Sequence, residues 1–227
     1  MNLIAGGMLT GKEIMKQVEE GNIKITPYDP KRVNPNSYNL RLHPELLVYE
    51  RNFPKDTGKN VGVSHQYKAL NKTVPSPADI YYNPSLKSFY DDGYLDMRQD
   101  NPTKKIIIPE EGYILYPGIL YIGRTVERTA SDMFIPMING RSSGGRLGIS
   151  IHVCAGFGDI GFDGTWTLEI TVVEPVKVYP NAELAQVCYF TPAGDNDILY
   201  RGKYYQQEDA TASRFYVDMA KEKEEVK

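Results

Sequence analysis

The segment "YILYPGILYIGRT", Tyr113 to Thr125, reads as two short strands joined by a turn. Aromatic and branched apolar residues, which favour extended chain, fill both runs, and Pro117-Gly118 between them is a turn dipeptide. Each run is also too short for a typical helix. The segment therefore predicts two short strands that follow one another in the chain.

Working outward, the chain from Lys105 to Phe190 repeats this pattern of short apolar runs, mostly bounded by Gly, Pro, Asn or Asp. The runs are "KIIIP", "YILYPG", "LYIGRT", "MFIPMI", "LGISIHV", "TWTLEITVV", "VKVYP" and "LAQVCYF". They do not alternate with helices, and no internal repeat is visible. Regular short strands with turns between them are typical of a sandwich, jelly roll or barrel.

The N-terminal part adds one helix and further strands. "TGKE" is a capping box for a helix from Thr10 to Glu20, in which the Thr10 hydroxyl caps the first turn and Glu13 reaches back. Gly21 ends this helix. "NIKITPYDP" predicts a short strand, and "NPNSYNLRLHPELLVYE" predicts a turn followed by a strand.

The composition is that of a turn-rich β protein of 227 residues, with 20 glycines, 15 prolines and 17 tyrosines. A net charge of −3 gives no sign of a nucleic-acid partner. No apolar run is long enough for a transmembrane helix and the N-terminus does not resemble a signal peptide, so we expect a cytoplasmic protein without a membrane partner. Cys154 and Cys188 lie in apolar runs and are expected to be buried free thiols.

The residues from 51 to 104 differ from the rest of the chain. They are polar, rich in Asn, Asp, Pro and Lys, and too numerous for a bare loop. We expect a single domain over residues 1–227 with an insertion at 51–104. This insertion either carries some structure of its own or packs its aromatic side chains on the main body, and the second alternative is favoured. Residues 196–227 are expected to form a C-terminal lid and tail, of which the charged end "MAKEKEEVK" frays.

The decamer "NGRSSGGRLG", Asn139 to Gly148, contains two arginines, two serines and four glycines. Glycines let the backbone approach a ligand closely, serines offer hydroxyl and N–H donors, and arginines offer planar forks that suit phosphate oxygens. The spacing of a P-loop is absent. Two interpretations remain open, a polyphosphate cradle and a Gly-rich β-turn with solvated arginines.

A second segment, "HVCAGFGDIGFDGTWTLEI", runs from His152 to Ile170 and places Asp159 in a Gly-flanked turn. Strand alternation puts Glu169 on the face opposite Leu168 and Ile170, within an apolar run. A partly desolvated carboxylate there can take up and return protons. The plainer alternative is a glutamate that faces solvent from a half-exposed strand.

Three motifs in order resemble the dCTP deaminase branch of the dUTPase superfamily. They are "GRSSGGRLG", then H-V-C-A-G-F-x-D-x-G-F-x-G-x-x-T-L-E-I, then "GKYYQQEDATASR", and the flanks "PNSYNLRL" and "PEEGYILYPGILYIGRT" agree with them. The resemblance covers most of the chain outside residues 51–104. It implies a distorted jelly-roll (dUTPase-like) β fold, a homotrimer with active sites between subunits, and deamination of dCTP to dUTP and ammonia.

The same resemblance implies the roles of individual residues. Glu169 would be the proton shuttle, the Ala155 carbonyl would position the water, and Ser142 and Arg146 would lie near the reacting centre. Asp159 would hold the deoxyribose 3′-hydroxyl, and Mg²⁺ would be carried in with the triphosphate. The other substrate contacts would be the phosphate cradle Arg141, Ser142, Ser143, Gly144, Gly145 and Arg146, the base contacts Thr167 and Leu168, and the closing residues Tyr200, Lys203 and Gln207.

A zinc-dependent deaminase is not supported by the residues. "HPE", His43 to Glu45, resembles the H-x-E element of such enzymes, but the P-C-x-x-C element is missing and the two cysteines are far apart in sequence. We therefore expect no protein-bound zinc. His152 is expected to be a structural strand residue rather than a base.

Three places depart from the family pattern. Cys154 replaces the usual Thr beside the catalytic water, which puts water placement and inhibition by dTTP in question. Ile160 replaces a common Pro. Glu208 and Asp209 replace a neutral or basic residue followed by Gly, and two acids near a triphosphate weaken its binding unless they point away.

Three other functions remain open beside simple deamination. The run A-G-F-x-D-x-G-F-x-G resembles the bifunctional members of the family more than the simple deaminases. The bifunctional members convert dCTP to dUMP and pyrophosphate, whereas the simple deaminases stop at dUTP. A dUTPase alone is a second alternative, although it would not need Glu169. The third is a non-catalytic protein on the same fold that binds dCTP or dUTP without turnover.

Overall fold

The structure, a computed structural model, describes residues 6–50, 95–154 and 156–225. Contacts within the chain divide it into two units, residues 1–48 with 104–212 and residues 49–103 with 213–227. The expected packing of the segment 51–104 falls largely on residues outside those described. A single domain with an insertion and a C-terminal lid therefore stays a prediction.

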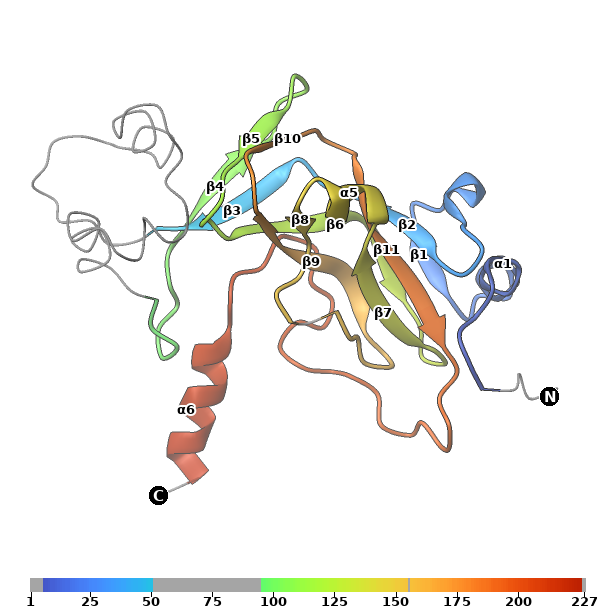
Figure 1. Ribbon diagram of the computed structural model, residues 1–227. Coiled ribbons are helices and arrows are strands. Elements are labelled where there is room, and N and C mark those ends of the chain that lie inside the picture. The colour runs from blue at the N-terminus through green and yellow to red at the C-terminus, as the bar shows by residue number, and fades with distance from the viewer. Residues whose placement is uncertain (1–5, 51–94, 155, 226–227) are drawn as a thin grey trace, which may run out of the picture. The chain divides into compact units, whose positions relative to one another are not determined.

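The described residues form three sheets (Figure 1). The strands are β1 (Lys24–Thr26), β2 (Tyr38–Arg41), β3 (Glu45–Tyr49), β4 (Thr103–Ile107), β5 (Tyr113–Leu115), β6 (Tyr121–Ala130), β7 (Ile135–Gly140), β8 (Ile149–Ser150), β9 (Asp163–Val172), β10 (Val176–Val178) and β11 (Glu183–Phe190). The largest sheet has the order β4-β3-β6-β9-β8, with β1 also paired to β6. The second has the order β2-β11-β7, and β5 pairs with β10. The prediction of a mainly β fold is confirmed.

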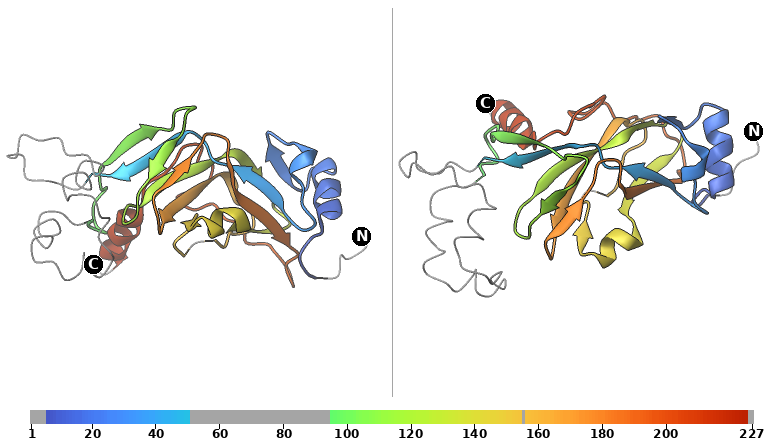
Figure 2. Two further views of the ribbon diagram at one scale, coloured as in Figure 1. Left: turned by 45° about the horizontal axis from the view of Figure 1, so that its top comes forward. Right: turned by 90° about the horizontal axis from the view of Figure 1, so that it is seen from above.

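Figure 2 shows the two larger sheets from two further sides. Side chains from both sheets belong to one hydrophobic core of the described residues. Leu168 and Ile170 of β9 enter it from the large sheet, and Val187 and Tyr189 of β11 enter it from the smaller one. Burial of apolar side chains between facing sheets is the main stabilising contribution in such a fold. The opposite side of β9, which carries Glu169, stays partly exposed, as the alternation predicted.

The predicted first helix is present as α1 (Gly11–Glu19). The Thr10 hydroxyl accepts a hydrogen bond from the Glu13 N–H at 3.3 Å, so the expected cap forms. The expected reach of Glu13 back to the N-cap is wrong for the described residues, because its carboxylate accepts from the Gln17 side chain at 2.8 Å instead. Gly21 follows the helix with a φ of 78°, a conformation that favours glycine.

Within the described residues, three helical segments were not predicted. They are the 3₁₀ helix η1 (Pro30–Arg32), α5 (Ser142–Arg146) and α6 (Phe215–Glu225). The charged end forms helix α6 as far as Glu225, since its Met, Ala, Lys and Glu have high helix propensity, and its fraying stays a prediction. Within the described residues, no helix is long and apolar enough to cross a membrane.

Candidate active site

The glycine-rich decamer folds into a helical turn. β7 ends at Gly140, Arg141 is the N-cap residue, and α5 follows directly. The β-turn interpretation is therefore wrong for Ser142–Arg146. Both serines and Arg146 are exposed, and Arg146 makes no hydrogen bond or ion pair with any described residue. These side chains are free to meet a ligand.

Gly148 returns the chain from α5 to the sheet. Its φ is 74°, and a Cβ built on it would lie 2.2 Å from Cγ2 of Val173. Its carbonyl accepts a hydrogen bond from the Val173 N–H at 3.0 Å. Only glycine fits this turn, which fixes the exposed α5 beside the end of β9.

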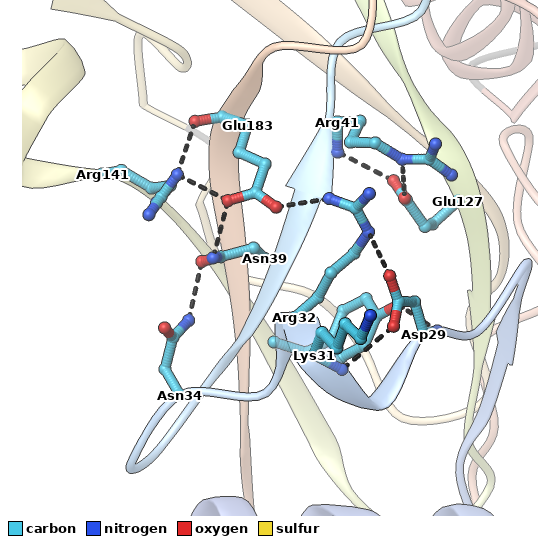
Figure 3. A network of polar contacts seen from close by, with 10 residues as sticks. Asp29, Lys31, Arg32, Asn34, Asn39, Arg41, Glu127, Arg141 and Glu183 are labelled. Atoms are coloured by element: carbon cyan, nitrogen blue, oxygen red, sulfur yellow. Dashed lines mark hydrogen bonds and ion pairs between the residues drawn. The ribbon is translucent and has the colours of Figure 1, made fainter.

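Arg141 differs from Arg146 because it already has an anionic partner. Its Nη1 donates to Oε2 of Glu183 at 2.8 Å and to the Glu183 carbonyl at 3.2 Å (Figure 3). The sequence indicated Arg141 but not Glu183, which looks like an ordinary polar residue at the start of a strand. Only the pairing of β11 with β7 brings the two side chains together.

Glu169 lies on β9 and is anchored through one oxygen. Its Oε2 accepts a hydrogen bond from the Val153 N–H at 2.8 Å, and its own N–H donates to the Ile151 carbonyl at 2.8 Å. Among the described residues, Oε1 has no hydrogen-bond partner. Glu169 therefore faces the loop after β8, with one carboxylate oxygen open to a ligand or water.

The loop after β8 differs from its prediction. β8 ends at Ser150, so His152 lies in a loop and not in the strand predicted over "LGISIHV", and Cys154 follows in the same loop. The Ser150 hydroxyl donates to the His152 carbonyl at 2.9 Å, which turns the chain away from the sheet. Nδ1 of His152 is buried and has no partner within the described residues. Ala155, the predicted water-positioning residue, lies outside the described residues.

Only one of the two cysteines is buried. Cys188 lies in β11, and burial raises the pKa of its thiol. Cys154 is exposed, so the prediction of two buried thiols is wrong for this residue. The reason is that the apolar residues before Cys154 lead into a loop after β8, whereas those around Cys188 form a strand of a sheet.

Asp159 is exposed at a pocket of about 440 Å³. Tyr200 lines the same pocket, so the structure brings these two predicted residues together. The other lining residues are mostly apolar: Ile135, Phe157, Gly158, Ile160, Ile198 and Leu199. A pocket with apolar walls and one carboxylate suits a ligand that has both a flat or apolar part and a hydroxyl group.

The C-terminal segment runs along β9. Nε2 of Gln207 donates to the Thr165 carbonyl at 2.8 Å and to the Thr167 hydroxyl at 3.3 Å. The Thr165 N–H donates to the Gln207 carbonyl at 3.0 Å. The backbone N–H of Tyr200 donates to the Ile160 carbonyl at 2.8 Å, and Nζ of Lys203 lies 5.4 Å from the centre of the Tyr204 ring. This segment therefore places Gln207 beside Thr167, and its role in closing over a substrate stays a prediction.

The Glu208 carboxylate forms an ion pair with Arg128. Its Oε1 accepts from Nη1 of Arg128 at 3.1 Å, while Asp163 holds the same guanidinium at 2.8 and 2.9 Å. The concern that Glu208 repels a triphosphate is thus reduced, because its charge is paired with Arg128. Asp209 is exposed.

The candidate residues fall into neighbouring groups and not one closed cluster. α5 precedes β8, and β8 pairs with the end of β9 through Ser150 and Thr171. In the described part of the chain, no hydrogen bond joins α5 to Glu169. Leu168 is buried, so only its backbone can serve the predicted base contact.

No metal-binding cluster was found within residues 6–50, 95–154 and 156–225, where no three His, Cys, Asp or Glu side chains are placed to hold an ion. The expectation of no protein-bound zinc stays a prediction, as does Mg²⁺ carried by the nucleotide.

Comparison with known proteins places these features in context. A family model described as "dCTP deaminase-like" matches residues 8–191. A protein of Clostridium beijerinckii named "dCTP deaminase, dUMP-forming" is 45% identical over 214 residues, which are 94% of this chain and 99% of that protein. A protein of Leptospira biflexa with the same name is 42% identical over 214 residues, with the same shares of the two chains. Each match covers 94% of this chain, and the residues that it leaves out are fewer than those of the segment 51–104. The matches therefore include part of that segment.

A solved structure also matches, with much lower sequence identity. It is the crystal structure of 2′-deoxycytidine 5′-triphosphate deaminase from Agrobacterium tumefaciens, with a TM-score of 0.53 and 18% identity. The match covers 82% of this chain and 49% of that chain. At this identity the likeness shows the fold alone, and it agrees with the jelly-roll fold that the motifs implied.

Proposed function

Because this chain belongs to the dCTP deaminase-like family, we propose that it converts dCTP to dUMP by deaminating the base and then releasing pyrophosphate. The overall reaction consumes two waters and yields dUMP, ammonia and pyrophosphate. The sequence favoured a reaction that stops at dUTP and kept the dUMP-forming reaction as an alternative. The names of relatives that are 45% and 42% identical to this chain support the alternative.

The one-sided anchoring of Glu169 is the observation that carries the deamination step. The Val153 N–H holds Oε2 at 2.8 Å, and no described residue occupies Oε1. In the proposed step, Glu169 takes a proton from water while hydroxide adds to C4 of cytosine. It delivers this proton to ring N3, then takes the proton of the new C4 hydroxyl and passes it to the amine, which leaves as ammonia while the C4 carbonyl forms. General acid–base help of this kind contributes about 10²–10⁴-fold in rate.

The triphosphate is proposed to bind at three cations, of which Arg146 is exposed and Arg141 and Lys203 are partly buried. Arg146 on α5 has no partner within the described residues, and Arg141 precedes it at the N-cap. Lys203 would approach from the C-terminal segment. Mg²⁺ would enter with the nucleotide as part of the substrate, and the planar arginine forks would bind phosphate oxygens.

Asp159 is proposed to serve the sugar and the second step. Its exposed carboxylate at the pocket would accept a hydrogen bond from the deoxyribose 3′-hydroxyl. In the second step it would orient the water that attacks the triphosphate. A carboxylate has two oxygens, so one can hold the hydroxyl while the other holds the water.

A homotrimer is the proposed assembly. Leu147, Val153 and Val173 lie near α5, β8 and the end of β9, and they are 60%, 66% and 71% exposed. Exposed apolar side chains around a candidate site support burial against another subunit. Light scattering of the purified protein should then give three times the chain mass of 25.6 kDa, whereas a single chain mass would refute the trimer.

A product assay tests the function. The protein is incubated with dCTP and Mg²⁺, and separately with dUTP and Mg²⁺, and nucleotides and ammonia are measured. Ammonia with dUMP and pyrophosphate is the expected result. Accumulation of dUTP would show a simple deaminase, hydrolysis of dUTP without ammonia would show a dUTPase, and no turnover of either would refute the enzyme. Adding dTTP to the dCTP reaction tests the inhibition that Cys154 puts in question.

A further inference from the structure

A carboxylate shared by two arginines lies next to the proposed phosphate site (Figure 3). Glu183 begins β11, and its Oε2 accepts from Nη1 of Arg141 at 2.8 Å and from Nδ2 of Asn39 at 2.9 Å. Its Oε1 accepts a hydrogen bond from Nη1 of Arg32. Glu183 therefore binds side chains from three separate segments.

Arg141 is held through one nitrogen only. Both of its side-chain contacts, to Oε2 and to the carbonyl of Glu183, use Nη1. Nε and Nη2 have no partner among the described residues, and the side chain is partly exposed. One edge of the planar guanidinium is thus fixed while the other edge stays open. An open, fixed edge is what two-point binding of a phosphate requires.

Glu183 is itself fixed from its other side. Arg32 binds Oε1, and Nε of Arg32 lies 3.6 Å from a carboxylate oxygen of Asp29. Oδ1 of Asn39 accepts from Nδ2 of Asn34 at 2.7 Å, which orients the Asn39 amide toward Glu183. Glu183 pairs with both Arg32 and Arg141, so its single negative charge does not fully neutralise Arg141. The Arg141 guanidinium therefore still attracts an anion.

We propose that Glu183 is a positioning residue that holds the Arg141 guanidinium with its free edge toward the triphosphate. Arginine has high side-chain entropy, and fixing it before binding lowers the cost of ordering it when the nucleotide arrives. The inference rests on the proposed function, since it takes Arg141 as a phosphate ligand. It adds Glu183 to the residues that contribute to triphosphate binding, and Arg32 and Asn39 hold the Glu183 carboxylate in place.

The first test compares Glu183→Gln with Asp29→Asn. Both remove one carboxylate charge from the same network, but only Glu183 contacts Arg141. Glu183→Gln should raise KM for dCTP about tenfold and leave kcat within about twofold, as expected for loss of a charge-assisted hydrogen bond to a binding group. Asp29→Asn should leave both constants within about twofold. An unchanged KM in Glu183→Gln would refute the proposal, and so would a lower KM, because Glu183 would then compete with phosphate.

A double-mutant cycle tests whether Glu183 acts through Arg141. In an Arg141→Gln background, Glu183→Gln should have no further effect on KM, whereas an additive effect would overturn the inference. Thermal unfolding of each variant reports folding. Should Glu183→Gln fail to fold, Glu183→Asp replaces it, since it keeps the charge but draws the carboxylate back. A KM raised severalfold with normal kcat would then support the proposal, and a wild-type KM would refute it.

Calorimetry with inorganic tripolyphosphate separates this inference from the proposed function. If the protein binds tripolyphosphate and Glu183→Gln weakens that binding about tenfold, the positioning role stands even when dCTP is not turned over. If dCTP is turned over but Glu183→Gln changes neither KM nor tripolyphosphate affinity, the function stands and the positioning role fails.

Discussion

At the scale of single residues, the deamination step depends on Glu169. Glu169→Gln keeps the size of the side chain and an oxygen that can accept from the Val153 N–H. We expect deamination to fall by about 10²–10⁴-fold while the Kd of dCTP stays within about threefold, because only proton transfer is lost. Ammonia release and calorimetric binding measure the two quantities. Glu174→Gln, at an exposed neighbouring carboxylate, is the matched control. Turnover near the wild-type rate in Glu169→Gln would remove the proton-shuttle role.

His43 provides a residue-scale prediction about pH. Burial lowers the pKa of its imidazole, and the nearby Arg124 guanidinium lowers it further. The folded protein thus holds the proton less tightly than the unfolded chain does. The stability from neutral His43 is present above the ordinary pKa of about 6.5 and is lost as the pH falls toward the lowered value. His43→Gln should therefore show a smaller fall in Tm between pH 7 and pH 5 than the wild type, and an equal fall would contradict this.

At the scale of secondary-structure elements, the start of α1 can be tested by its cap. Thr10 is exposed, and its hydroxyl accepts from the Glu13 N–H at 3.3 Å. Thr10→Ala should lower the free energy of unfolding by about 1 kcal/mol, since it leaves a helix N–H without its cap. Thr10→Ser keeps the hydroxyl and should cost much less. Urea unfolding of the three proteins measures the difference, and equal losses in both variants would show that the cap does not stabilise α1.

At the scale of the whole molecule, the C-terminal segment is expected to close the nucleotide site. A chain that ends at Leu199 loses the contacts that Gln207 makes with Thr165 and Thr167. We expect the Kd of dUTP with Mg²⁺ to rise at least about tenfold in this truncated chain. A chain that ends at Ala212 keeps these contacts and is the matched control. Calorimetry measures both, and an unchanged Kd after the longer truncation would remove the closing role.

The sequence alone determined the class of fold and the family. Each strand run after Lys105 appears in the structure, although the run before His152 is shorter than expected, because period-2 alternation and turn residues are local signals. The motif around Glu169 carried the family resemblance for the same reason, since its residues are close in sequence. Local patterns did not reveal α5, because glycine-rich chain has low helix propensity and the turn after it depends on Val173.

Tertiary structure alone decided which groups face the candidate site. Glu183 meets Arg141 only because β11 pairs with β7, and Glu208 meets Arg128 only because the C-terminal segment returns to β9. These partners are 42 and 80 residues apart in sequence, and no local pattern links residues at such separations. Strand propensity and turns act over a few residues, whereas the charge environment of a side chain depends on which strands become neighbours.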